Sequence, residues 1–208
     1  VMDLLLDEEY LEKINSEITK GIRKSGNTTH VSVVDEYDNF ASITTSHGEG
    51  CGYYIPNTDI MLNNMLGEED LCPEGFFNWP ENKRISSMMS PTLFLERNKP
   101  IAALGSGGSN RIRSAIVQAI SNYIDFGMSP DESVNAPRIH WENNHLDVEP
   151  GYDLDIIDSL KLPGDAEKIF WSAKNMYFGG VHAVFKDKKG HIEAAGDRRR
   201  VGATRKIQ

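Results

Sequence analysis

One short segment near the start of the chain, Gly26 to Asp35, constrains the fold more than any other. From Thr29 onward apolar and polar side chains alternate, which predicts a β-strand with two different faces. The pair Thr28-Thr29 stands where that strand begins, directly after Gly26-Asn27, which favours a tight turn. A hydroxyl held there can attack the preceding peptide bond, and the new N-terminal residue then carries both a nucleophile and an amine that serves as its base. Propensity alone favours the simpler interpretation, an ordinary strand start.

The composition is that of a globular domain with a slightly polar surface. The 208 residues are enough for one hydrophobic core, and the hydrophobic and charged fractions, 39% and 25%, are ordinary. A formal net charge of −9 argues against non-specific nucleic-acid binding and against an anionic membrane surface. No apolar stretch is long enough for a membrane span. We interpret Arg198 to Arg200 as a solvated patch at the end of a strand, and Cys51 and Cys72, which lack metal-ligand spacing, as free thiols.

The order of the predicted elements indicates an α+β fold with mainly antiparallel strands. The clearest helix is Arg111 to Phe126, directly after a strand and the glycine-rich turn Gly105 to Asn110. A short helix is expected after Ser129, its N-cap, because Pro130 follows at the first helical position. Other helices are expected at 2–23 and 153–160, and strands at 29–35 with 40–45, 92–95 with 101–104, 146–149, 168–171, and 179–185 with 191–195.

Residues 28–35, TTHVSVVD, resemble the start of the small subunit of γ-glutamyltransferases (γ-glutamyltranspeptidases), and the similarity runs from about Leu4 to about Gly202. In that family the first threonine of the pair becomes the N-terminal nucleophile after the precursor cleaves itself. The resemblance implies an N-terminal nucleophile hydrolase sandwich, αββα, of which this chain supplies about half. It implies cleavage between Asn27 and Thr28, so that residues 1–27 are the tail of the large subunit and 28–208 the small-subunit catalytic domain.

Two glycine-containing segments are candidate parts of the catalytic machinery. The loop Ser46 to Gly52 would let the backbone approach a ligand closely, although a long turn explains it as well. The resemblance assigns the hydroxyl that supports the nucleophile to Ser46, whereas the asparagine that the family places nearby is absent from this loop. Strand, glycine turn and helix N-terminus at 101–111 form an anion-binding arrangement. The resemblance makes Gly107 and Gly108 the oxyanion hole, with Ser109 as an alternative register.

The resemblance also places the substrate-binding groups. A Leu-Asn-Asn segment followed by an acid matches Asn64 and Glu68, and the acid would bind the α-ammonium of the substrate; Glu69 and Asp70 are the near alternatives. The glutamine that many members place after Asn-Asn is Met65 here. The pair Ser86 and Ser87 would bind the α-carboxylate, with Ser87 the safer match because of an extra methionine. Without the resemblance, the acids are a solvated surface and the serines an ordinary turn.

The expected function is therefore γ-glutamyl transfer or hydrolysis on glutathione and related small molecules, with the large subunit of the same precursor as partner. The resemblance implies no metal or cofactor. Three alternatives stay open: an acylase that cleaves glutaryl-type side chains, a poly-γ-glutamate hydrolase, and an unprocessed fragment without activity. An acylase would not need an acid at Glu68, so the acidic triplet argues against it. His182 and His191 lack triad spacing and are interpreted as structural histidines.

Overall fold

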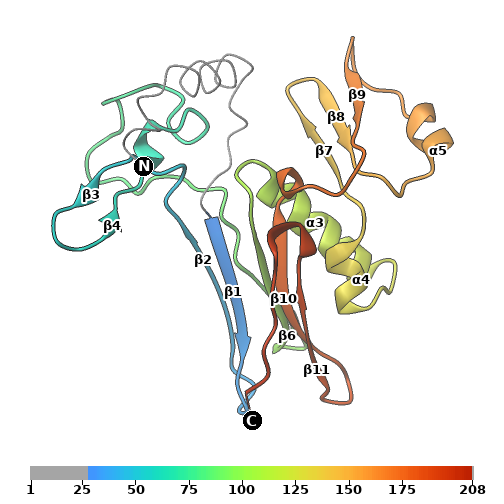
Figure 1. The fold of residues 1–208 in the computed structure, drawn as a ribbon. Coiled ribbons are helices and arrows are strands. Elements are labelled where there is room, and N and C mark those ends of the chain that lie inside the picture. Colours follow the sequence, from blue (N-terminus) through green and yellow to red (C-terminus); the bar gives the residue numbers. More distant parts are fainter. Residues whose placement is uncertain (1–27, 208) are drawn as a thin grey trace, which may run out of the picture.

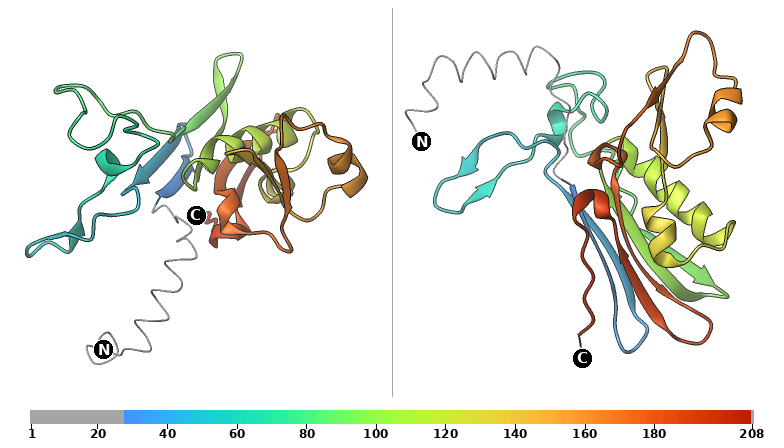
Figure 2. Two further views of the ribbon diagram at one scale, coloured as in Figure 1. Left: turned by 90° about the horizontal axis from the view of Figure 1, so that it is seen from above. Right: turned by 45° about the vertical axis from the view of Figure 1, so that its right-hand side comes forward.

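The computed structural model describes residues 28–207, and these form a layered α+β fold (Figure 1). A two-stranded hairpin, a four-stranded sheet and a pair of helices lie in three successive layers, which Figure 2 shows in its right-hand view. The helix expected at 2–23 and the cleavage-site residue Asn27 lie outside the described residues. The two-stranded hairpin, the four-stranded sheet and the α-helices fall where alternation and helical spacing predicted them.

The central layer is an antiparallel sheet with the strand order β11-β10-β6-β5. Its strands are β5 (Thr92–Glu96), β6 (Lys99–Gly107), β10 (Gly180–Lys186) and β11 (Ile192–Gly196). Both predicted hairpins are present, but β6 is longer than predicted at both ends. Only Arg97 and Asn98 remain in the β5–β6 turn, both at positive φ, and the strand runs to Gly107 because its last residues pair with the start of β10.

The hairpin of β1 (Thr28–Val34) and β2 (Phe40–Ser46) lies on one face of this sheet. Polar side chains on its inward face bond to the sheet beneath: the Ser42 hydroxyl donates to the carbonyl of Leu104 at 2.9 Å, and the Ser32 hydroxyl donates to the carbonyl of His182 at 3.3 Å. These bonds fix the hairpin's position along the sheet, and with it the position of Thr28 at the hairpin's open end.

The helices α3 (Arg111–Ile124) and α4 (Pro130–Asn135) cover the opposite face of the sheet. Ser129 caps α4 as predicted, and a reciprocal bond with Glu132 completes a capping box. The apolar side chains on the inward face of α3 are buried at the start of the helix, whereas Ile120 and Tyr123 are partly buried against the core and Ile124 is exposed. The main core consists of apolar side chains from the sheet and these two helices: Ala102, Leu104, Ile112, Ala115, Ile116, Ala119, Val134, Val181, Ala183, Phe185 and Ala195.

A smaller sheet lies beyond the helices, with the order β7-β8-β9. It comprises β7 (Ile139–Glu142), β8 (His145–Val148) and β9 (Glu167–Phe170), with α5 (Leu154–Ser159) between the last two. Strand β7 was not predicted, and β9 pairs parallel to β8. The short 3-10 helix η2 (Met176–Phe178) then leads into β10, and η3 (Arg198–Arg200) follows β11.

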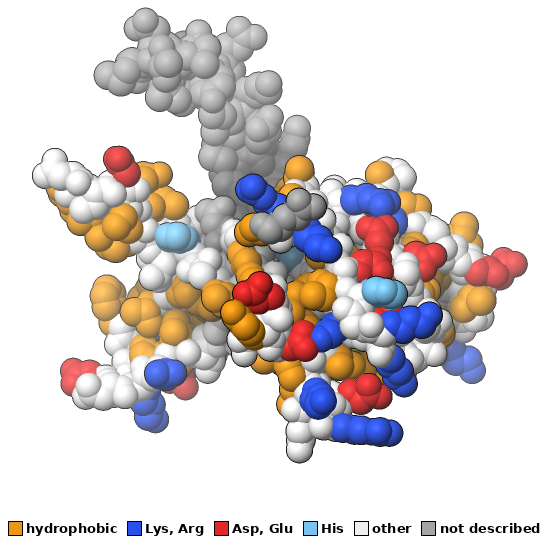
Figure 3. Space-filling model, turned by 90° about the horizontal axis from the view of Figure 1, so that it is seen from below, with side chains coloured by type: hydrophobic (Ala, Val, Ile, Leu, Met, Phe, Trp, Pro, Cys, Tyr) orange, Lys and Arg blue, Asp and Glu red, His pale blue; other side chains and the backbone are white. Residues whose placement is uncertain are grey.

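Residues 47–90 form an irregular arm beside the hairpin, and within it lie β3 (Tyr54–Ile55), β4 (Ile60–Met61) and the single 3-10 turn η1 (Met65–Gly67). Many large apolar side chains are exposed there, among them Tyr53, Tyr54, Ile60, Phe76 and Phe77. Figure 3 shows hydrophobic side chains gathered on this side of the molecule. Both cysteines, Cys51 and Cys72, are free, as predicted.

The prediction that Arg198 to Arg200 form a solvated patch is wrong for Arg199, whose side chain is 1% exposed. Its guanidinium bonds to Glu149 and Asp197, and Arg138 joins them with a 2.6 Å contact to Asp197. Burial acts to raise the pKa of Asp197, but the two cations outweigh it and hold that pKa below its ordinary value. Arg138 also donates to two carbonyls just before β10, those of Phe178 and Gly179, so it braces this loop.

Candidate active site

The candidate nucleophile is held by the pairing register of the first hairpin. Thr28 lies directly opposite Ser46 across β1 and β2, and their hydroxyl oxygens are 2.9 Å apart. The backbone N–H of Gly48 donates to the same Ser46 oxygen at 3.0 Å. Ser46 therefore connects the Thr28 hydroxyl to the glycine loop that follows β2, which is the arrangement needed to orient a hydroxyl nucleophile.

A buried histidine lies beneath this pair and was not singled out from the sequence. His30 contacts the Thr44 hydroxyl at 2.7 Å and the Ser32 hydroxyl at 2.9 Å, and its ring fills the space above Gly105. Burial, and secondarily the neighbouring His182, lowers the pKa of His30 to about 4. The ring is thus neutral near pH 7 and acts as a brace between the hairpin and the sheet. The sequence signal that could have identified His30 is its place on the inward face of β1, where its ring must be buried.

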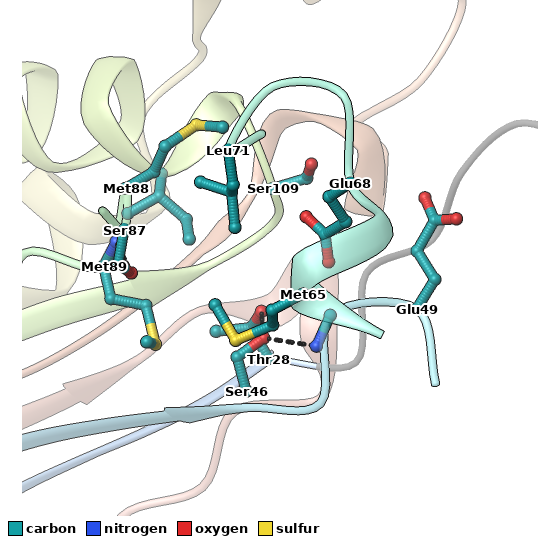
Figure 4. A pocket seen from close by; sticks show the side chains of 12 residues that line it. Thr28, Ser46, Glu49, Met65, Glu68, Leu71, Ser87, Met88, Met89 and Ser109 are labelled. Carbon is teal, nitrogen blue, oxygen red and sulfur yellow. Dashed lines mark hydrogen bonds between the residues drawn. The ribbon is translucent and has the colours of Figure 1, made fainter. Parts of the chain in front are cut away.

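The pocket next to Thr28 is lined by residues from five separate segments of the chain (Figure 4). Its polar side chains include expected catalytic and substrate-binding residues together with Glu49, which was not predicted: Thr28, Ser46, Glu49, Glu68, Ser87 and Ser109. Its apolar lining comes from three methionines and two branched residues: Met65, Leu71, Met88, Met89 and Ile112. Hydroxyls, carboxylates and an adaptable apolar lining thus surround one small space.

One of the two acids that line this pocket comes from the predicted acidic segment. Glu68 is half-buried and lines the pocket, whereas its neighbours Glu69 and Asp70 are exposed. In Figure 4 the Glu68 side chain points from η1 toward the side of the pocket that carries Thr28 and Ser46. The turn η1 sets the direction of the Glu68 side chain, because Glu68 ends that turn with its N–H bonded to the Met65 carbonyl at 3.3 Å.

The other expected binding residues differ in where they lie. Ser87 lines the pocket, and its hydroxyl accepts the N–H of Met89 at 3.0 Å. Both serines are exposed, and Ser86 does not line the pocket. The amide oxygen of Asn64 accepts the N–H of Glu49 at 2.8 Å, so this part of its side chain holds the glycine loop. The structure thus brings Ser87 to the pocket and gives Asn64 a bracing contact.

The glycine turn between β6 and α3 approaches Thr28 closely. A side chain on Gly107 would place its Cβ 2.4 Å from the Thr28 carbonyl oxygen, and one on Gly108 would place it 2.6 Å from the Cα of Gly179. Gly108 also has φ +135°, which strains any other residue. Only glycines fit at both positions. The N-terminus of α3 follows at once, so backbone dipoles favour negative charge beside the pocket.

Residues 28–207 contain no group of three or more histidines, cysteines or acids placed to hold a metal ion. Within the same residues, no helix combines the length and apolar character that crossing a membrane requires. The polar side chains that line the pocket carry hydroxyls and carboxylates.

Comparisons with known proteins agree on one family. The γ-glutamyltranspeptidase family profile matches residues 1–207. The glutathione hydrolase proenzyme of Bacillus subtilis (strain 168) is 32% identical over 182 residues, which is 86% of this chain and 30% of that protein. The acylase ACY 1 proenzyme of Pseudomonas sp. (strain SE83) is 32% identical over 193 residues, which is 92% of this chain and 34% of that protein.

Comparison with solved structures finds the same family. A crystal structure of a γ-glutamyltranspeptidase mutant from Helicobacter pylori superimposes with a TM-score of 0.68 at 30% identity, covering 82% of this chain and 99% of that one. The chain spans about a third of the length of the curated relatives that it matches.

Proposed function

The chain belongs to the γ-glutamyltranspeptidase family, and from that premise we propose that it is the nucleophile-bearing part of an enzyme that transfers or hydrolyses γ-glutamyl groups. The observation that carries the proposal is the pocket itself. It places the Thr28 hydroxyl 2.9 Å from that of Ser46 and sets Glu68 in the same lining. A nucleophile and a carboxylate that can bind an ammonium group are what a γ-glutamyl donor requires.

The proposed reaction is acyl transfer in two steps. The Thr28 oxygen attacks the γ-carbonyl of the donor, and the α-amine of Thr28, once it is a free N-terminus, takes up the hydroxyl proton. Ser46 orients the hydroxyl. Backbone N–H groups of Gly107 and Gly108 stabilise the oxyanion beside the N-terminus of α3. The amine of the donor leaves with a proton, and water or an acceptor amine then attacks the γ-glutamyl ester and releases Thr28.

Substrate recognition is assigned to the opposite side of the pocket. Glu68 binds the α-ammonium of the donor, because a half-buried carboxylate and an ammonium form a charge-assisted hydrogen bond. Ser87 binds the α-carboxylate through its hydroxyl. Ser86 and Asn64, which do not line the pocket, support this role less well. Glutathione and other small γ-glutamyl compounds are the proposed donors.

The acylase alternative is as close in sequence as the hydrolase, at 32% identity in both comparisons. Identity therefore does not separate the two activities, and the side chains of the pocket must. A glutaryl donor lacks the α-ammonium group, so it has no use for a carboxylate at Glu68. The position of Glu68 in the lining favours the γ-glutamyl donor.

The proposed partner is the rest of the same precursor, cleaved from this chain between Asn27 and Thr28, with residues 1–27 as the tail of the large subunit. The outward face of the β1–β2 hairpin supports this assignment. Val31, Val33 and Ile43 form an apolar strip there and are 50–57% exposed. An apolar sheet face of this kind is normally covered, and the missing half of an αββα sandwich would cover it.

The test is to express this chain with the remainder of its precursor, measure the intact mass of each product, and assay a panel of γ-glutamyl and glutaryl anilides. The proposal predicts a product that begins at Thr28, a co-purifying large subunit, and faster turnover of the γ-glutamyl anilides. An uncleaved Asn27–Thr28 bond without turnover would support the inactive-fragment alternative. A preference for glutaryl anilides would support the acylase.

A further inference from the structure

We propose that Gly48 is a positioning residue that sets the selectivity for γ-glutamyl donors, because its missing side chain gives Glu68 the space it occupies. This inference rests on the proposed function and deepens it. It concerns the loop after β2, where sequence alone indicated only that a backbone approaches a ligand. The geometry identifies which glycine matters and which side chain depends on it.

Gly48 is buried and lies directly against the recognition side of the pocket. A Cβ added to it would lie 2.0 Å from Oε1 of Glu68 and 2.4 Å from Oδ1 of Asn64. Real Cβ atoms do not approach heavy atoms this closely, so a side chain at position 48 must displace one of these two groups. Its φ of +62° adds a backbone conformation that non-glycine residues rarely adopt.

The group that must move is the carboxylate of Glu68. Asn64 is bonded on both sides of Gly48: its amide oxygen accepts the N–H of Glu49 at 2.8 Å, and its own backbone N–H donates to the carbonyl of His47 at 3.3 Å. These two bonds hold the loop and Asn64 together as a unit. The atom of Glu68 that meets the added Cβ is Oε1, at the far end of a flexible side chain, so the carboxylate can shift without any movement of the backbone.

Gly48 also connects recognition to the chemistry. Its N–H donates to the Ser46 oxygen at 3.0 Å, and Ser46 contacts Thr28. One residue therefore fixes the position of the nucleophile's partner on one side and of the ammonium-binding acid on the other. This fixes the span between the attacked carbonyl and the charged end of the donor, so donors with an α-ammonium at γ-glutamyl distance are selected.

The experiment compares Gly48→Ala with Gly52→Ala in the enzyme assembled with the rest of its precursor. Gly52 has a similar φ of +74°, but a Cβ there would meet no atom within 4 Å. Both variants carry backbone strain, and only Gly48→Ala crowds Glu68. We expect Gly48→Ala to lower kcat/KM for γ-glutamyl anilides by about 10- to 100-fold relative to glutaryl anilides, mainly through KM. Gly52→Ala should leave the ratio between donors unchanged.

The double variant Gly48→Ala/Glu68→Asp is the rescue. Shortening the acid by one methylene withdraws the carboxylate from the new Cβ, so the double variant should recover part of the donor preference that Gly48→Ala loses. A merely structural glycine would not be rescued by a change at Glu68. Equal effects of Gly48→Ala and Gly52→Ala on both donors, or failure of the rescue, would overturn the inference and leave the proposed function intact. If the wild-type enzyme turned over no γ-glutamyl anilide, the proposed function itself would fail.

Discussion

The two sides of the pocket are built in different ways. The side that carries Thr28 is held by contacts between distant parts of the chain: the β1–β2 register sets Thr28 opposite Ser46, and Ser42 ties the hairpin to Leu104. The side that carries Glu68 and Ser87 belongs to the irregular arm 47–90. Its backbone bonds join residues of the arm itself, from near neighbours such as Glu68 N–H to Met65 to more separated pairs such as Asn64 N–H to His47.

We propose that the two sides have different roles. The groups proposed to take part in bond making lie on regular elements whose geometry is set by two sheets and a helix. The groups proposed to recognise the donor lie on loops, where the sequence can change without disturbing the scaffold. Substitutions on the first side should therefore affect all donors alike, whereas substitutions on the second should change the ratio between donors.

The largest effect is expected at Thr28. Thr28→Ala should abolish both cleavage of the Asn27–Thr28 bond and turnover of every donor, because one hydroxyl performs both reactions. Thr29 supplies the control, since it is exposed on the opposite face of β1. The readouts are intact mass and the anilide assay. If Thr28→Ala still matures and Thr29→Ala does not, the nucleophile has been assigned to the wrong threonine.

The next effect is expected at the glycine turn. Gly108→Pro removes one backbone N–H and cannot adopt φ +135°, so kcat should fall by about 10²–10³ for both donor classes while Thr28 is still acylated slowly. Gly127→Pro is the control, because Gly127 has φ +64° and open space around it after α3. An unchanged kcat in a folded Gly108→Pro protein would remove the turn from the mechanism.

A smaller and selective effect is expected at Glu68. Glu68→Gln should lower kcat/KM for γ-glutamyl donors by roughly 10- to 100-fold and spare glutaryl donors, because a bond from an ammonium to a carboxylate contributes about 1.5–3 kcal/mol. Glu69→Gln and Asp70→Asn are matched controls on exposed neighbours. A selective loss in either neighbour would shift the register of the motif. Equal treatment of both donors by all three variants would count against the division between the two sides.

The smallest effect concerns stability rather than donors. The unfolded-state pKa of His30 is near 6.5 and its folded value is about 4, so the unfolded chain binds more protons between these values. Stability from the neutral ring is fully present above about pH 6.5 and declines as the pH falls toward 4. In urea titrations across this range, His30→Gln should show a flatter dependence of the unfolding free energy on pH. If the unfolding free energy changed with pH equally in the wild type and in His30→Gln, His30 would not be the source of the pH dependence.

The helices and strands that were predicted correctly are those whose sequence pattern can be recognised within a few neighbouring residues. Alternation predicted β1 and β2, helical spacing predicted α3, and Ser129 before Pro130 predicted the cap of α4. Strand β7 was missed because it is only four residues long and has a buried histidine on its inner side. Short segments of mixed polarity carry little periodicity.

What the sequence could not show depends on partners far along the chain. Arg199 seemed solvated because its partner Glu149 lies fifty residues earlier. The role of Gly48 depends on a contact with Glu68, and no spacing rule relates a loop glycine to an acid on a separate turn. The resemblance named Thr28, Ser46, Glu68 and Ser87, and the structure places all four along one pocket. It also favoured Ser87 over Ser86, and of the two only Ser87 lines the pocket.

The central claim, that Thr28 forms the acyl-enzyme, is tested most directly by trapping that ester. The assembled enzyme is quenched with acid during steady-state turnover of a γ-glutamyl anilide, digested, and its peptides are mapped by mass spectrometry. The account predicts one γ-glutamyl group on the peptide that begins at Thr28, located on the Thr28 side chain and lost on mild alkaline treatment. A γ-glutamyl group on Thr29, Ser46 or any other residue, with Thr28 unmodified during turnover, would contradict it.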